Sequence, residues 1–394
     1  MSKMTNPSPS GTFFDYYKLP GPWYNVKYAI YYWFFTAIKM ILRFFDVHTK
    51  HGKPEDNDGP HELNNNIGYD ATWIGGTTPD GKWIILALDR RNDCKMSIGY
   101  ACLKIPGIGH LSTPMYPNSM ENELGNSDDG FTLDRFTLTV IEPLRRWKVN
   151  FEGEMTFVDD PETSAHVKIT AEWTSQHDVW LLNRDLSSES FADSFALENW
   201  TMFSATLFDR SKDDVVHWEQ FGRLDANIEI DKIGIEIQNA ATVRDRSFGK
   251  IRDFTALHRY FYITMFLEDG RSMVITVVCH KKTFSRLFFG FISNDDGTNS
   301  NIDWTDLNIY QFGENGRVAG ELCFLIRIGK VIRTVQVVCD NEHWYRLEKG
   351  VVRCEQIGDC LVDHVPGKCM IQSLYSETSL RAKTFCKPLS YLDY

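Results

Sequence analysis

The sequence predicts an all-β protein, built as two tandem antiparallel β-barrels and preceded by one amphipathic helix. Three observations lead to this class. Aromatic residues make up 13% of the 394-residue chain, and aromatic side chains favour sheets over helical bundles. After residue 50, apolar residues occur in short strand-like runs separated by turn signals, without a long helical period. One strand-turn-strand pattern also occurs twice, which indicates a duplicated unit.

The duplicated pattern relates Asp80–Tyr100 to Asp269–Phe291. Each copy starts at an Asp-Gly turn, continues through an apolar strand to a basic pair, and ends in a glycine followed by an aromatic residue. Two units of the size of an up-and-down barrel fit the chain length. We therefore predict a first barrel over residues 66–210 and a second over residues 211–380. Chance similarity between two hairpins is the alternative interpretation.

Turn residues mark several strand ends. The Asp-Gly pairs at Asp80–Gly81, Asp269–Gly270 and Asp296–Gly297 predict hairpin or loop tips. Asn227–Gln238, with the sequence NIEIDKIGIEIQ, alternates isoleucine with polar residues on both sides of Asp231–Lys232. This pattern predicts a β-hairpin that turns at those two residues.

The two ends of the chain differ from the barrels in composition. Residues 1–17 are rich in Ser, Pro and Asn, which predicts a disordered leader. Residues 18–45 form an amphipathic helical segment, and residues 46–65 are polar and turn-rich, as expected of a linker. We treat residues 381–394 as a C-terminal tail.

The helical segment has two unlike faces. Tyr28, Tyr32, Thr36 and Lys39 follow one another at helical spacing and form the more polar face. The other side is almost entirely apolar: Trp33, Phe34, Ala37, Ile38, Ile41 and Phe45. Such a helix is typical of one that lies in a membrane interface or is clamped across the body of its own protein.

Three placements of this helix therefore remain open: on a membrane surface through residues 28–45, on the protein's own sheet, or across a bilayer. A span needs about 20 apolar residues, and Lys39 and Arg43 interrupt this run. Between Lys18 and Lys53 there are six basic residues and one acidic residue, which favours anionic surfaces. The run starts far from Met1 and lacks a cleavage site, so it does not predict a secretory signal. The predicted localisation is cytoplasmic, with membrane association as an open alternative.

Composition also limits the partners. The net charge of −11 gives no electrostatic support for nucleic-acid binding. Nine cysteines occur without a Cys-x-x-Cys pair, which indicates free, mostly buried thiols in a reducing compartment. The close spacings of a zinc site are missing, so we predict neither a metal nor a cofactor.

A cluster of charges interrupts the strand pattern in Val243–Phe254, VRDRSFGKIRDF. On an extended strand, Arg244 and Arg246 point together, opposite Asp245 and Ser247. Bidentate arginine–carboxylate pairs commonly lock a sheet corner or a domain seam. We therefore interpret four members as a structural cluster that acts together with Asp245: Arg244, Arg246, Arg252 and Asp253.

A second polar pair precedes this cluster. His217 and Glu219 share one face of a strand, and with Asp245 they are candidate catalytic residues surrounding a polar spot in an apolar cavity. An acid in such a place has a raised pKa and can act as a general acid near neutral pH. Four aromatic residues are candidates for ligand contact and for stabilising a carbocation: Trp218, Phe248, Tyr260 and Tyr262. As a metal site, His217 and Glu219 with the distant His258 form a weak set.

Two segments carry a family resemblance. Val216–Asp231, VHWEQFGRLDANIEID, followed by Val243–Phe254, resembles the double lipocalin-like, calycin-type proteins related to carotenoid hydratases and the AttH group. It looks most similar to the region that precedes a phosphoenolpyruvate-synthase-like phosphotransferase in some animal proteins. In that pattern a His/Tyr-x-Glu strand leads to an Arg-Asp-x-Ser-Trp-Gly turn, and here Phe248 replaces the tryptophan.

The resemblance implies lipocalin-like barrels and an apolar, isoprenoid- or lipid-like ligand. It leaves the reaction open between a hydratase or cyclase, that is, a lyase or isomerase, and a non-catalytic carrier or sensor, because one scaffold serves several activities. Phosphoryl transfer is not carried over, since the sequence has neither an ATP-binding Gly-rich loop nor a swivelling phosphohistidine region.

Overall fold

The computed structural model describes residues 12–13, 16–44, 53–64, 68–91, 96–114, 120–123, 131–200, 215–281, 283–313, 318–339, 341–348 and 350–376. The expectations for most of the leader, for Phe45 and for the tail over residues 381–394 lie outside these residues. A short pair of strands, β1 (Thr12–Phe13) and β2 (Tyr17–Lys18), precedes the first helix.

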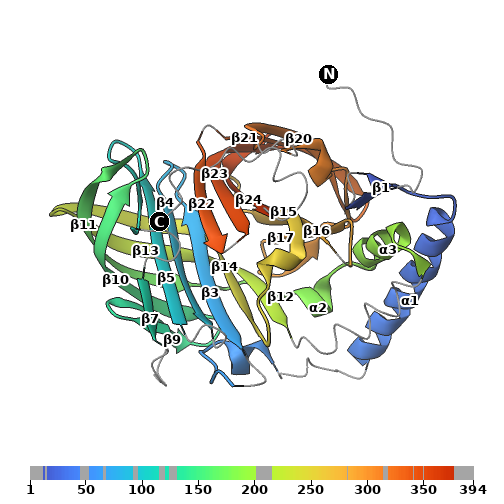
Figure 1. The fold of residues 1–394 in the computed structure, drawn as a ribbon, viewed down its shortest axis with the longest axis horizontal. Helices are drawn as coiled ribbons and strands as arrows, with labels where there is room; N and C mark the ends of the chain where they lie inside the picture. The colour runs from blue at the N-terminus through green and yellow to red at the C-terminus, as the bar shows by residue number, and fades with distance from the viewer. Residues whose placement is uncertain are drawn as a thin grey trace.

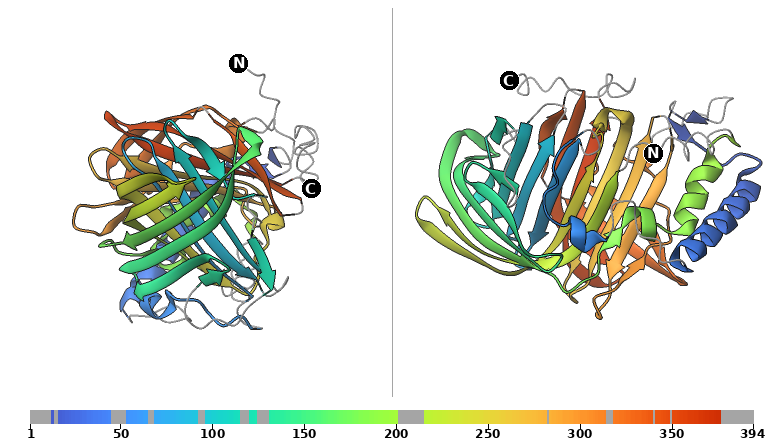
Figure 2. Two further views of the ribbon diagram at one scale, coloured as in Figure 1. Left: turned by 90° about the vertical axis from the view of Figure 1, so that its left-hand side faces the viewer. Right: turned by 90° about the horizontal axis from the view of Figure 1, so that it is seen from below.

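Most of the described chain belongs to two antiparallel sheets that lie side by side (Figures 1 and 2). The first sheet has twelve strands. They are β3 (Tyr69–Thr77), β4 (Trp83–Arg91), β5 (Met96–Ile105), β6 (Gly109–Ser112), β7 (Met120–Glu123), β8 (Phe131–Leu133), β9 (Phe136–Glu142), β10 (Arg146–Phe157), β11 (Asp160–Thr174), β12 (Trp180–Leu181), β13 (Val216–Ile230) and β14 (Ile233–Gly249). The order β11-β13-β14-β3-β4-β5-β6-β10 closes on itself because β10 also pairs with β11. This half is therefore a barrel.

The second sheet has ten strands. They are β15 (Leu257–Leu267), β16 (Ser272–His280), β17 (Leu287–Ser293), β18 (Asn299–Asn301), β19 (Trp304–Thr305), β20 (Glu321–Ile328), β21 (Val331–Cys339), β22 (His343–Glu348), β23 (Val351–Val362) and β24 (Val365–Ser376). Strand β18 pairs with β17 at one edge, and β19 pairs with β20 at the other. The segment 299–305 thus joins both edges and completes the second barrel.

The pairing order confirms the predicted all-β, two-barrel class and matches the predicted duplication. Strands β3, β4 and β5 form a meander in the first sheet, as β15, β16 and β17 do in the second. In each sheet a final hairpin then returns to the start, so that β14 pairs with β3 and β24 pairs with β15. The two halves therefore share one topology.

The division between the barrels differs from the predicted boundary at residues 210 and 211. Strand β13 pairs with β11, and β14 pairs with β3, over long registers. Both strands therefore belong to the first barrel, and the chain crosses to the second barrel between Gly249 and Leu257, through the short 3-10 helix η2 (Phe254–Ala256). Local pattern could not place this boundary, because the partners of a strand are set by segments far away in sequence.

The predicted turns are present. Gly81, Gly270 and Gly297 have φ angles of +85°, +92° and +85°, a backbone conformation that glycine adopts without steric cost. Asp231 and Lys232 have φ angles of 46° and 74°, as the two-residue turn of the β13–β14 hairpin requires.

Three apolar layers hold the barrels together. One core fills each barrel, and a third cluster lies between them. Along β4, Ile84 and Leu86 point into the first barrel, whereas Trp83 and Ile85 join the cluster between the barrels. Because such strands are buried on both faces, their apolar runs are continuous rather than alternating.

The N-terminal helix α1 (Tyr24–Phe44) packs mainly on a second helix, α3 (Ser188–Leu197) (Figure 1). A short helix, α2 (Leu182–Asp185), precedes α3. Tyr31 and Phe35 are the buried contacts of α1, and the ring of Phe35 stacks on Phe191 at 4.6 Å. The predicted helix is therefore confirmed, and a helix rather than a sheet covers its inner face. Among the described residues, no helix is both long and apolar enough to cross a membrane.

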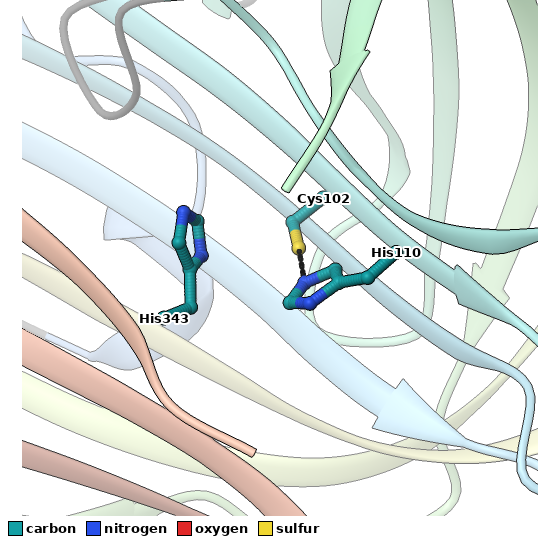
Figure 3. A group of neighbouring side chains, drawn as sticks. All are labelled: Cys102, His110 and His343. Carbon is teal, nitrogen blue, oxygen red and sulfur yellow. Dashed lines mark hydrogen bonds between the residues drawn. The ribbon is translucent and has the colours of Figure 1, made fainter. Parts of the chain in front are cut away.

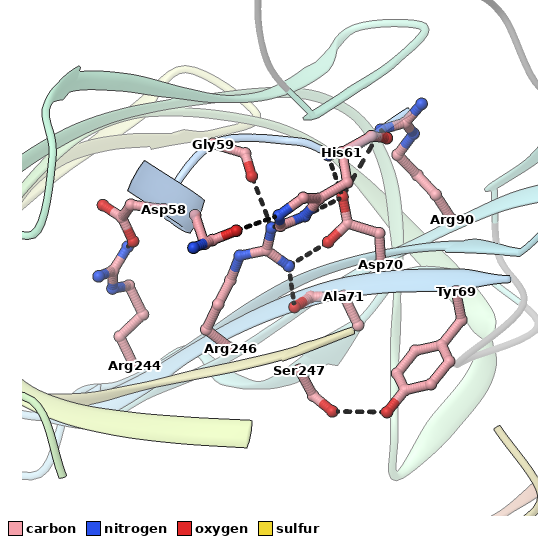
Figure 4. A network of polar contacts seen from close by, with 11 residues as sticks. Asp58, Gly59, His61, Tyr69, Asp70, Ala71, Arg90, Arg244, Arg246 and Ser247 are labelled. Carbon is pink, nitrogen blue, oxygen red and sulfur yellow. Dashed lines mark hydrogen bonds and ion pairs between the residues drawn. The ribbon is translucent and has the colours of Figure 1, made fainter. Parts of the chain in front are cut away.

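The segment over residues 53–64, predicted as a linker, is anchored to the first barrel. It contains the 3-10 helix η1 (Pro54–Asn57), followed by the fully buried Asp58. The Asp58 carboxylate accepts hydrogen bonds from the Leu144 amide at 2.7 Å and from the Trp147 indole at 2.8 Å. It also pairs with Arg244, 2.7 Å away (Figure 4).

The structural cluster predicted around residue 245 exists, but with other partners. Arg246 pairs with Asp70 and donates to the Gly59 carbonyl at 2.6 Å (Figure 4). Asp245 lies on the opposite face of β14, so it cannot serve as the carboxylate of either Arg244 or Arg246, as the sequence analysis assumed. The carboxylates that do so come from positions 58 and 70, far away in sequence.

The last two charges of the cluster have separate roles. The Arg252 side chain lies 3.7 Å from Asp89 and over the ring of Tyr69. Asp253 caps the helix η2 by accepting the Thr255 amide at 2.9 Å. Both residues of the predicted cluster therefore have structural contacts, but with residues outside the cluster.

Asp58→Ala should lower the free energy of unfolding by roughly 3–5 kcal/mol, because it leaves the Arg244 guanidinium buried without its carboxylate. Urea denaturation would measure this loss. Asp56→Ala, an exposed acid of the same segment, is the matched control and should change stability by less than about 0.5 kcal/mol. Equal effects of the two variants would contradict the assigned ion pair.

Candidate functional site

A cavity of about 460 Å³ lies between the two barrels. Strands β3, β4, β5, β13 and β14 of the first barrel and β15, β16, β17, β23 and β24 of the second contribute to its wall. Its aromatic residues include Trp73, Tyr100, Tyr260, Tyr262 and Phe289. The cavity is therefore formed by the outer faces of both sheets and not by the inside of one barrel.

His217, Glu219 and Asp245 come together in this wall because of strand register. Glu219 of β13 is paired with Asp245 of β14, and His217 lies two residues away on the same face. The His217 Nε2 atom is 3.2 Å from Glu219 Oε1, and its Nδ1 atom is 3.4 Å from Asp245 Oδ1. One imidazole thus lies between two carboxylates.

The three side chains differ in their access to solvent. The Glu219 side chain is fully buried, whereas the side chains of His217 and Asp245 are 19% and 30% exposed. From the second barrel, the Tyr262 hydroxyl donates to Glu219 Oε2 at 3.1 Å. Glu219 is therefore the innermost acid of the group, and Asp245 is its link to water.

The electrostatics of the group favour a bound proton. Burial lowers the pKa of His217, but the Asp245 and Glu219 carboxylates outweigh burial and raise this pKa to about 9. Burial raises the pKa of Glu219, an effect that His217 opposes and Asp245 reinforces. Burial and the Glu219 carboxylate raise the pKa of Tyr262, so that its phenol keeps its proton and remains a donor.

This arrangement can move protons. A cationic His217 next to Glu219 can supply a proton to that carboxylate, and a protonated Glu219 can transfer it to a ligand in the cavity. Asp245, on the solvent side, stabilises the positive charge of the His217 imidazolium. The group therefore has the parts of an acid–base relay: a buried donor, a reservoir and a stabilising carboxylate.

The second barrel contributes a matching pair of residues. Glu219 on β13 and Glu355 on β23 occupy equivalent positions in the two barrels. Glu219 pairs with Asp245 on the last strand of the first barrel, and Glu355 pairs with Gln372 on the last strand of the second. In this correspondence Arg353 takes the place of His217. The basic residue, a spacer and a glutamate therefore occur in both barrels, as His217-x-Glu219 and Arg353-x-Glu355.

The second pair is organised differently from the first. Tyr345 donates to Glu355 Oε1 at 2.7 Å and accepts from Arg353 at 3.2 Å. Gln372 also donates to Glu355, at 3.1 Å. Arg353 lies over the ring of Tyr260, 5.9 Å from its centroid, and lines the cavity. Because a guanidinium cannot be a general acid at ordinary pH, this end of the cavity is suited to binding rather than to proton transfer.

The structure brings most of the sequence-predicted site residues together and leaves two outside. His217, Glu219, Asp245, Tyr260 and Tyr262 line the cavity. Trp218 and Phe248 do not line it and pack instead in a separate apolar cluster. Strand alternation explains the difference, because Trp218 lies between His217 and Glu219 and so points to the other face.

Sequence analysis missed Arg353, which lines the cavity from the second barrel, and its neighbour Glu355. Arg353 and Glu355 lie outside the repeated segments Asp80–Tyr100 and Asp269–Phe291. The sequence feature that could have revealed them is a basic residue, a spacer and a glutamate on the penultimate strand of each barrel. Sequence analysis also missed Trp73, which pairs with Asp245 in the first sheet as Tyr262 pairs with Gln372 in the second.

The comparisons with known proteins agree with this architecture. A family model described as a family of unknown function (DUF8627) matches residues 2–352. The chain belongs to this family. No curated protein matches the sequence significantly.

Solved structures of other proteins are similar to this chain. The crystal structure of an AttH protein from Nitrosomonas europaea is similar, with a TM-score of 0.55 at 14% identity, covering 85% of this chain and 97% of that one. Kievitone hydratase from Nectria haematococca has a TM-score of 0.49 at 9% identity, covering 79% and 89% of the two chains. CghA bound to Sch210972 has a TM-score of 0.49 at 10% identity, covering 81% and 95%. The predicted resemblance to the AttH group is thus confirmed for the fold, and the relation to animal phosphotransferases stays a prediction.

The stability of the protein should fall as pH rises from about 6.5 to 9. His217 has a folded pKa of about 9 against an ordinary value of 6.5, so the stabilisation from its cation is complete below 6.5 and is lost as pH rises through 9. The difference corresponds to roughly 3 kcal/mol. Urea denaturation at a series of pH values would measure it.

His217→Gln should flatten this slope. His166→Gln, which removes a half-exposed histidine of β11, is the matched control and should leave the slope of the unmodified protein unchanged. A slope that survives His217→Gln would show that the histidine is not held as a cation between its two carboxylates.

Proposed function

We propose that this protein binds a hydrophobic small molecule, of isoprenoid or lipid type, in the cavity between the barrels and protonates one of its carbon–carbon double bonds. The observation that carries the proposal is the contact of His217 with both Glu219 and Asp245 in the wall of a cavity that also contains several aromatic side chains. A volume of about 460 Å³ is also in the range of small-molecule sites.

In this proposal Glu219 is the general acid. Its carboxyl proton forms a new C–H bond at one alkene carbon, and the π electrons leave a carbocation at the other. The rings of Tyr260, Tyr262 and Trp73 line the cavity, and their faces stabilise a cation. Water or a second double bond of the same molecule then attacks the cation, which gives an alcohol or a ring.

The proton balance closes within the site. Water that adds to the cation loses one proton, and the Glu219 carboxylate is the base that accepts it. The net reaction is addition of water, with the acid regenerated. His217 supports Glu219 by holding a proton next to it, and Asp245 supports His217. Protonation of an unactivated alkene is difficult in water, and a buried acid with a raised pKa is the group that favours it.

Arg353 gives the ligand an orientation. It lines the cavity from the second barrel, whereas His217 and Glu219 belong to the first. A guanidinium binds oxygen acceptors such as hydroxyl, carbonyl or carboxylate groups. We infer that the ligand carries an oxygen function at one end, placed at Arg353, and the reactive double bond at the other, placed at Glu219.

A non-catalytic carrier or sensor is the alternative function, and Glu219→Gln separates the two. The proposed enzyme should retain its melting temperature and ligand binding in this variant but lose turnover by at least about a hundredfold. Native mass spectrometry and solvent extraction of the purified protein would supply the ligand. Deuterium incorporation from D₂O into that ligand would measure turnover.

Glu229→Gln is the matched control, because Glu229 lies on the same strand and is exposed. It should leave deuterium incorporation unchanged. Turnover that persists in Glu219→Gln would refute the general-acid role. A bound ligand that takes up no deuterium even in the unmodified protein would favour the carrier.

We also propose that the protein attaches to a lipid surface through the outer face of α1. The polar face of this helix packs against the rest of the protein. The Tyr24 hydroxyl donates to Asp193, and Lys27 and Lys39 donate to backbone carbonyls around α3. The opposite face remains exposed, including Trp33 at 69% and Phe44 at 83%. This is the reverse of an ordinary amphipathic helix, which buries its apolar side.

A lipid surface fits this face better than a second protein. The exposed side carries the tryptophans that prefer the headgroup region, Trp23 and Trp33. Residues 18–53 have six basic residues and one acidic residue in a chain of net charge −11, but Lys18, Lys27 and Lys39 bind groups inside the molecule. The choice of a lipid surface therefore rests on the exposed apolar and aromatic side chains. A helix of 21 residues lying flat is typical of interfacial binding.

Trp33→Glu combined with Phe44→Glu should abolish flotation with vesicles of phosphatidylcholine and phosphatidylserine, because both side chains would carry charge into the apolar layer. Val331→Glu combined with Ile332→Glu is the matched control, since these exposed apolar residues lie on the second barrel. Flotation that is equal in both double variants would refute the attachment through α1.

A further inference from the structure

Three side chains from both barrels meet outside the cavity. Cys102 lies on β5, His110 on β6 and His343 on β22 (Figure 3). One ligand atom of each residue lies within 4.8 Å of the other two. The Cys102 sulfur is 3.0 Å from His110 Nε2, and the rings of His110 and His343 meet edge to face at 5.2 Å.

Sheet register explains why the three residues converge. Cys102 pairs with Ser112 and Lys104 pairs with His110, so Cys102 and His110 are diagonal neighbours on one face of the first sheet. That face is the one turned to the second barrel, since Cys102 belongs to the cluster between the barrels. His343 reaches the same place from the second barrel, where it begins β22.

The group has the composition and the spacing of a transition-metal site. A thiolate and two imidazoles are ligands that zinc prefers. Tetrahedral zinc, with bonds of about 2.0–2.3 Å, needs ligand atoms roughly 3.3–3.8 Å apart. The observed atoms lie within 4.8 Å of one another, so small side-chain rotations bring them to this geometry.

The surroundings are compatible with a divalent cation. Glu355 acts electrostatically on Cys102, and Asp159 on His343, whereas Lys104 acts on Cys102 and His110. Two negative groups thus accompany one positive group around the ligands.

We propose that Cys102, His110 and His343 form a Zn²⁺ site that joins the two barrels. The fourth position of a tetrahedral ion is left to a water molecule, since the chain supplies three ligands in this group. The ion binds the first barrel through Cys102 and His110 and the second through His343. Its role is to hold the two sheets in a fixed relation.

The position of the site connects it to the cavity. Tyr100, which lines the cavity, lies two residues from Cys102 on the same face of β5. Tyr345, the partner of Arg353 and Glu355, lies two residues from His343 on β22. A metal at this place therefore fixes the cavity end where Arg353 lies, without taking part in the proton relay around Glu219.

Metal binding to the full-length protein is the first test. The protein is treated with a chelator, dialysed and titrated with Zn²⁺, with calorimetry and elemental analysis as readouts. We expect one Zn²⁺ per chain and a higher melting temperature after addition. Co²⁺ in place of Zn²⁺ should give the thiolate-to-cobalt charge-transfer absorption of a single cysteine ligand.

Variants of the ligands are the second test. Cys102→Ser should remove the charge-transfer absorption. His343→Asn should weaken Zn²⁺ binding by at least roughly a hundredfold, because losing a ligand costs at least as much affinity as losing a residue that only supports a ligand. The melting temperatures of the metal-free variants show whether they still fold. His110→Asn is the substitute if Cys102→Ser does not fold.

Cys323→Ser is the matched control, because Cys323 is an exposed free cysteine. It should leave stoichiometry, affinity and cobalt absorption unchanged. Absence of stoichiometric Zn²⁺ binding would overturn the proposal. So would loss of binding in Cys323→Ser, or a cobalt spectrum that survives Cys102→Ser, since each would place the metal elsewhere.

Discussion

The buried ion pairs of Arg244 with Asp58 and of Arg246 with Asp70 are the interactions on which the site depends. Both arginines point from β14 into the first barrel. Arg244 also lies over the rings of Trp147 and Trp173, at 4.6 and 4.5 Å. An unpaired guanidinium in such a place would be very costly. The pairs therefore lock the register of β14 and, by alternation, the position of Asp245 on its other face.

This constraint links the structural and the chemical halves of one short segment. The even-numbered residues of Val243–Phe248 face the first barrel and residues 53–64, whereas Asp245 and Ser247 face the cavity. A one-residue slip of β14 would place arginines in the cavity and Asp245 in the barrel core. The same alternation on β13 places His217 and Glu219 in the wall and removes Trp218 from it. The charges of this segment thus have two roles: the arginines stabilise the first barrel, and Asp245 stabilises His217.

The interface between the two similar barrels is asymmetric, because equivalent positions carry different residues. Two barrels of like topology pack through equivalent outer faces, and the shared cavity is lined by His217 and Glu219 of the first barrel and by Arg353 of the second. In one copy the basic residue is His217, which exchanges protons, and in the other it is Arg353, which does not. Glu219 contacts a titrating imidazole, whereas Glu355 is held by Tyr345 and Gln372. One end of the cavity is therefore suited to proton transfer and the other to binding.

The sequence by itself determined the elements whose physical causes are local. The Asp-Gly turns, the hairpin at Asp231–Lys232 and the amphipathic α1 follow from backbone preference and from periods of two and 3.6 residues. The shared face of His217 and Glu219 follows from the same alternation. Tertiary structure decided what depends on distant partners: the carboxylates of Asp58 and Asp70, the membership of β13 and β14 in the first barrel, and the meeting of Cys102, His110 and His343. Pairing between remote strands and burial between two sheets leave no periodic signal in the chain, which is why only the fold could reveal them.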